Sequence, residues 1–147
     1  MLRNLIFLTL MAFANISYAL TFEQAHVFGE AISDEGSKCG LSRDASVSAV
    51  ETALRQNRIA INEKAKYNFY LNTNSLYLDQ GCVANTHLEV GFYSYVNPPN
   101  GDKAVFAEVI LCTRGMIMSG PSYNLQTRIN DNYRSMAEQC VSEIQKK

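Results

Sequence analysis

The chain has 147 residues, with 13 basic and 14 acidic side chains and a formal net charge of −1. This balance excludes the strongly basic surface typical of proteins that bind nucleic acid or an anionic membrane. The length suits one domain of the commonest size with a single contiguous core, whereas two domains would each be too small.

The first 19 residues have the pattern of a secretory signal peptide. Arg3 provides the basic start, and an apolar run extends from Leu5 to Ala14. Ser17 and Ala19 are the small residues that signal peptidase accepts before the cut. An uncleaved membrane anchor is the alternative, but the apolar run is far shorter than the roughly 20 residues of a spanning helix. We therefore expect residues 20–147 to form the mature domain, with no stable membrane anchor after processing.

The start of the mature chain predicts two helices. Thr21 and Gln24 form a capping box before a short helix over residues 22–33. Gly36 allows a left-handed turn that ends this helix. Ser42 is the expected N-cap of the second helix. Its buried stripe consists of apolar residues at helical spacing: Val47, Val50 and Leu54.

After the second helix the apolar residues alternate with a period of two, which predicts half-buried strands. Ile59 and Ile61 mark the first strand, and residues 67–71 form the next. Residues 72–75, with the sequence NTNS, are expected to form a turn or bulge before the apolar segment 76–78.

The clearest sheet element is a β-hairpin. Residues 88–96 and 104–113 are rich in β-forming side chains, and they flank the loop NPPNGD at residues 97–102. Residues 104–111 are apolar at both parities except at Glu108. That pattern predicts a strand buried on both faces, not an edge strand.

A turn at Arg114–Gly115 or at Gly120–Pro121 precedes the longest helix, which Ser122 caps and which extends to about Gln145. Its apolar stripe follows spacings of three and four: Leu125, Ile129, Tyr133, Met136, Cys140 and Ile144. The element order predicts one α+β domain, in which an antiparallel sheet of about four strands is packed by N-terminal helices and a long C-terminal helix. Helices on one face only are the second possibility.

All four cysteines follow the signal peptide: Cys39, Cys82, Cys112 and Cys140. An even number of cysteines in an exported chain predicts two disulfides. A zinc site would need paired ligands a few residues apart, which this spacing does not provide, and free buried thiols are the other alternative. If the last helix folds back over the preceding strand, Cys140 lies near Cys112 and leaves Cys39 to pair with Cys82.

No motif assigns a catalytic residue, a metal ligand or a cofactor site, so the chain is expected not to be an enzyme. His26 and His87 lack the spacing of a zinc enzyme, and disulfides would remove the thiols that a cysteine nucleophile needs. Glu89 and Glu108 are the acidic residues deep inside strands, and they could converge as a carboxylate pair of a hydrolase. Alternatively, they lie on a solvated strip or pair with Arg114 or Lys103.

Tyr93 and Tyr95 lie on one face of the predicted strand, whereas Leu88 and Val90 lie on its other face. If those aliphatic residues face the core, both tyrosines face outward beside the loop with Pro98 and Pro99. Exposed tyrosine provides contact area at low entropic cost, so these two residues are the candidate partner-binding site. The alternative is that both pack beneath a helix on the second face of the sheet.

Together these features predict a small exported binding or accessory protein of the periplasm or the secreted fraction. It would act on another envelope or secreted protein, as an inhibitor or immunity-type protein or as an envelope assembly factor. No sequon follows the signal peptide, which agrees with a bacterial source.

A small hydrolase and a carrier of an apolar ligand are the alternatives. An enzyme predicts a concave pocket around Glu89, Glu108 or a histidine, whereas a binding protein predicts an exposed patch of tyrosines and loop. The sequence assigns no oligomeric state.

Overall fold

A computed structural model of the chain describes residues 23–79, 81–101 and 103–146. The expected signal peptide and Thr21 of the expected capping box lie outside these residues. The elements in chain order are β1 (Gln24–Gly29), α1 (Asp34–Lys38), α2 (Arg43–Gln56), β2 (Ala60–Ile61), β3 (Tyr67–Leu78), β4 (Gly81–Val96), β5 (Val105–Gly120) and α3 (Ser122–Gln145). No helix in this part of the chain is long and apolar enough to cross a membrane.

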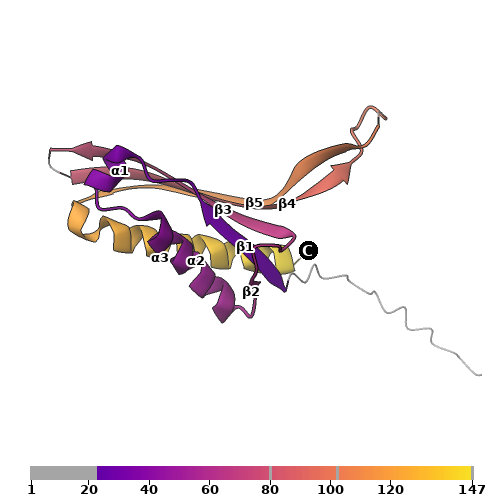
Figure 1. The fold of residues 1–147 in the computed structure, drawn as a ribbon, viewed down its shortest axis with the longest axis horizontal. Coiled ribbons are helices and arrows are strands. Elements are labelled where there is room, and N and C mark those ends of the chain that lie inside the picture. Colours follow the sequence, from indigo (N-terminus) through magenta and orange to yellow (C-terminus); the bar gives the residue numbers. More distant parts are fainter. Residues whose placement is uncertain (1–22, 80, 102, 147) are drawn as a thin grey trace, which may run out of the picture.

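The five strands form one mixed sheet in the order β2-β1-β3-β4-β5. The strands β3, β4 and β5 are antiparallel, whereas β1 runs parallel to both β2 and β3. Figure 1 shows α2 and α3 side by side along one face of this sheet. The α+β prediction is confirmed, and the sheet is mixed because β1 joins it.

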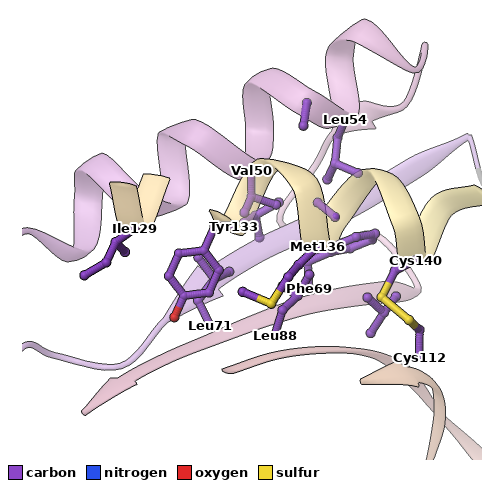
Figure 2. Packing of buried hydrophobic residues seen from close by; sticks show 14 of the residues in the cluster. Val50, Leu54, Phe69, Leu71, Leu88, Cys112, Ile129, Tyr133, Met136 and Cys140 are labelled. Carbon is purple, nitrogen blue, oxygen red and sulfur yellow. A yellow bond between two sulfur atoms is a disulfide. The ribbon is translucent and has the colours of Figure 1, made fainter. Parts of the chain in front are cut away.

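The core lies between the sheet and the two long helices (Figure 2). Every residue of the predicted α3 stripe is at most 4% exposed. On the sheet, alternate residues of β4 are buried against these helices: Cys82, Ala84, Thr86, Leu88 and Val90. The expected core face of α2 is also present, with Val50 and Leu54 fully buried. Ser42 caps α2 by accepting a hydrogen bond from the Ala45 backbone N–H at 3.3 Å.

The predicted first helix is wrong, because this segment forms β1. Ala25 and Val27 are buried while His26 and Phe28 lie on the other side, which is the period of a strand. Parallel pairing with β2 and β3 supplies the hydrogen bonds of β1. These strands are distant in sequence, so the local pattern of residues 22–33 does not predict the pairing. The expected helix end instead forms α1, which Ser33 caps by accepting from the Gly36 backbone N–H at 3.2 Å.

The expected turn at residues 72–75 is also wrong, because β3 continues through it in register with residues 84–87 of β4. The segment lacks apolar alternation, but hydrogen bonds from its polar side chains hold it in the sheet. Thr73 Oγ1 lies 2.8 Å from the hydroxyl of Tyr133 in the core. The chain turns after Gly120, so Pro121 is the N-cap of α3 and Ser122 is its first helical residue.

The prediction that residues 104–111 are buried on both faces is wrong as well. Residues 105–111 belong to β5, which is the last strand of the sheet. Phe106 is 62% exposed and Ile110 is 53% exposed. The apolar run has the composition of a central strand, but it forms an edge.

The structure contains two disulfides with the predicted pairing. Cys39 and Cys82 have Cα atoms 5.9 Å apart, and those of Cys112 and Cys140 are 5.6 Å apart. The first disulfide ties the segment after α1 to β4. The second ties α3 to β5 (Figure 2).

Candidate protein-binding surface

The hairpin of β4 and β5 projects beyond the rest of the sheet (Figure 1). Pairing between β3 and β4 ends at Asn68 and Gly91, whereas pairing between β4 and β5 continues to Val96 and Val105. Residues 92–96 and 105–109 therefore form a two-stranded ribbon without a third strand among the described residues. We call this ribbon the arm.

A β-bulge marks the base of the arm. Val90 pairs with Cys112 and Gly91 pairs with Ile110, so Leu111 is an extra residue on β5. Bulges bend a strand and increase its twist. The two backbones also approach closely here, since a Cβ at Gly91 would lie 2.8 Å from the carbonyl oxygen of Val109. Glycine therefore permits the bend from which the arm leaves the sheet.

Three aromatic side chains gather on one face of the arm: Tyr93, Tyr95 and Phe106. The Phe106 ring stacks on Tyr93 with centroids 5.7 Å apart and meets Tyr95 edge-on at 5.3 Å. Tyr93 is 52% exposed and Tyr95 is 73% exposed. The alternative that both tyrosines pack beneath a helix is therefore wrong. We call these three residues the aromatic patch.

The sheet face that α2 and α3 do not cover carries a polar strip along β3. Glu30 accepts hydrogen bonds from the hydroxyl of Tyr70 and, at 2.6 Å, from Asn72 Nδ2. The bond to Glu30 raises the pKa of Tyr70, because the carboxylate favours the protonated phenol. Asn74 Nδ2 donates to Asn72 Oδ1 at 2.6 Å and continues the strip. These side chains bind each other and hold the strip in one arrangement.

The two candidate carboxylates do not converge. Glu89 lies opposite Thr113 and Glu108 lies opposite Tyr93, four residues further along β4. This places their backbones about 13 Å apart along the strand, and the Glu89 carboxylate instead faces His87, whose Nε2 lies 3.8 Å away. Arg114 binds Glu143 of α3 instead of either residue. The geometry therefore does not support a paired-carboxylate hydrolase.

The histidines are also separated. His87 Nε2 lies 3.8 Å from Glu89 and 3.4 Å from Thr113 Oγ1, whereas His26 stacks on Phe28 of β1. Within residues 23–79, 81–101 and 103–146, no three His, Cys, Asp or Glu side chains are grouped as metal ligands. A carrier would need a cavity for an apolar ligand between the sheet and α3. Contiguous core side chains fill this space, including Phe69, Leu88 and Tyr133.

Sequence reasoning found the two tyrosines but missed Phe106 and the exposure of β5. The available signal was the pairing of residues 93–95 with residues 106–108 across a short loop, since aromatic residues at such positions meet on one face. The apolar run from Ala104 to Leu111 instead favoured a strand buried on both faces.

Comparisons with known proteins add a distant structural likeness. No protein-family model matches the chain, and no curated protein matches it. A solved structure of a PelC dodecamer from Paraburkholderia phytofirmans is similar over 84% of this chain and 86% of that chain. The sequences are 15% identical, and the TM-score is 0.42. At this distance the likeness carries no argument about function.

Proposed function

We propose that this protein is an exported binding protein whose arm contacts another envelope or secreted protein. The exposed aromatic patch is the observation that carries this proposal. Its three side chains together leave roughly 370 Å² uncovered, if each exposes up to about 200 Å² when free. Patches of this size on small proteins are often functional. Tyrosine and phenylalanine are also enriched at protein interfaces.

The covalent framework supports a location outside the cytoplasm. Two disulfides join parts of the fold that are distant in sequence. Such bonds form and persist in oxidising compartments such as the periplasm. An inhibitor or immunity-type protein and an envelope assembly factor both require a rigid domain with an accessible contact surface. The disulfide-linked fold and its arm supply these two properties.

An affinity capture tests the proposal. The oxidised protein, residues 20–147, is used as bait in envelope extract beside a variant with Tyr93→Ala and Tyr95→Ala. The control is Tyr123→Ala, which removes a tyrosine that is 86% exposed on the first turn of α3, outside the arm. We expect the wild type and the control to retain one stoichiometric protein that the double variant loses. Equal capture by the double variant, or no captured protein at all, would contradict the proposal.

A further inference from the structure

The outer edge of β5 is long, and its protection is limited to the bulge at Leu111 and the charges of Glu108 and Arg114. In an edge strand, alternate residues direct their N–H and C=O groups away from the sheet, where they can pair with another strand. Natural edges are commonly short or contain proline or lysine. The 16 residues of β5 contain neither. Its exposed apolar side chains span the strand: Val105, Phe106, Ile110, Met116 and Ile117.

We infer that β5 is the interface with a second copy of this chain, which adds its own β5 in antiparallel pairing. Opposite residues of an antiparallel pair lie on the same face. The bulge at Leu111 reverses the parity of β5: Phe106 and Ile110 share the uncovered face with Thr113 and Ile117. A two-fold axis between Leu111 and Cys112 satisfies this condition.

That register is selected by the side chains that it brings together. It places Phe106 of one copy opposite Ile117 of the other, so the two most exposed apolar residues of the strand cover each other. On the helix side, Ala107 lies opposite Met116. Shifting the register by two residues would instead place Phe106 against Gly115 or Ser119. The chosen register also places no like charges opposite each other, since Glu108 meets Gly115 and Arg114 meets Val109.

Pairing would also complete the arm. An isolated two-stranded ribbon is only marginally stable in water, whereas three strands with an apolar face support one another. In the proposed register, residues 105–109 of one arm pair with residues 114–118 of the second copy. The aromatic patch then continues across the interface as the row Tyr95, Phe106 and Ile117 of the second copy. The second copy thus supplies the third strand that β3 does not provide.

The dimer also fits in size and shape. If pairing covers them fully, five exposed apolar side chains of roughly 100 Å² each, with the outward backbone, bury at most roughly 700 Å² per copy, against about 800 Å² per partner in a standard interface. Because α3 contacts both β4 and β5, it lies between these strands, and the two copies of α3 would lie about 9.5 Å apart, or two strand spacings. This distance is within the 8–10 Å of packed helices, so the two helices would pack side by side across the axis.

Sedimentation equilibrium of the purified, oxidised protein tests the dimer and its register. We expect the wild type to have twice the monomer mass at about 100 μM, and Phe106→Lys or Ile117→Glu to weaken the dimer at least tenfold. An equimolar mixture of these two variants should regain the dimer, because lysine then faces glutamate at one contact and Ile117 faces Phe106 at the other. The control Ser48→Lys, on the exposed side of α2, should stay dimeric.

A monomeric wild type would overturn the inference. A dimer that both charged variants leave intact would overturn it too, and failure of the mixture to regain the dimer would overturn the register. Circular dichroism of each variant establishes that it is folded. No extract is present in this experiment, so its outcome is independent of the capture of a partner by the arm.

Discussion

Removal of the Cys112–Cys140 disulfide should cost a large part of the stability of the domain. The two residues are 28 positions apart, and their link holds α3 against β5. A closed loop of this length lowers the entropy of the unfolded chain, which corresponds to about 3.5 kcal/mol in the chain-entropy model. Cys112 is 5% exposed and Cys140 is fully buried. We therefore expect the paired substitution Cys112→Ala and Cys140→Ala to lower the free energy of unfolding by about 3 to 5 kcal/mol.

Urea denaturation followed by far-ultraviolet circular dichroism measures this loss. The slope of the free energy against urea should rise in the variant, because the unfolded chain without the link exposes more surface. The matched control is Cys39→Ala with Cys82→Ala, which opens a longer loop of 43 positions. The chain-entropy model gives this control a loss larger by about 0.4 kcal/mol. A loss below about 1 kcal/mol in the first variant would refute the reasoning that the link between α3 and β5 stabilises the fold.

Three further substitutions test the core, the bulge and a helix cap. Tyr133→Phe removes the hydroxyl that donates to the Asn72 carbonyl at 2.6 Å, and it should cost about 1 to 2 kcal/mol in urea denaturation. Burial raises the pKa of Tyr133 to about 12, so ionisation of this tyrosine favours the unfolded chain above pH 10. The unfolding free energy of the wild type should then fall by up to about 1.4 kcal/mol per pH unit, a loss that Tyr133→Phe does not show. Parallel pH profiles of the two proteins would contradict this. Gly91→Ala should lower the unfolding free energy by about 1 to 3 kcal/mol, because its Cβ would lie 2.8 Å from a backbone oxygen; an unchanged thermal midpoint would show that the bulge relaxes freely. Ser42→Ala should cost about 1 kcal/mol through loss of the α2 cap, and Ser42→Asp, which retains an acceptor, should restore most of it.

Local sequence patterns predicted the elements that are defined by residues close together in the chain. The α3 stripe and the Ser42 cap both appear in the structure as expected. The disulfide pairing followed from the lengths of a helix and a strand that fold back on each other. These features depend on residues close in sequence or on simple geometry, so the chain itself contains the information.

The remaining features depend on neighbours that the local sequence does not specify. Residues 24–29 form a strand because β2 and β3 pair with them on both sides. The run from Val105 to Leu111 has the composition of a central strand, yet no described strand lies beyond it. An edge with the composition of a central strand suggests that its partner belongs to another molecule. The aromatic patch was predicted in part, since Tyr93 and Tyr95 were identified without Phe106.

Site-specific photo-crosslinking in cells tests whether the arm binds another protein. A photoreactive phenylalanine analogue replaces Tyr95 in the aromatic patch or, as the control, Tyr123 on α3. We expect one adduct with a different protein at position 95 and none at position 123. Absence of an adduct at position 95, adducts of equal strength at both positions, or adducts of this chain with itself alone would contradict a partner-binding role for the arm.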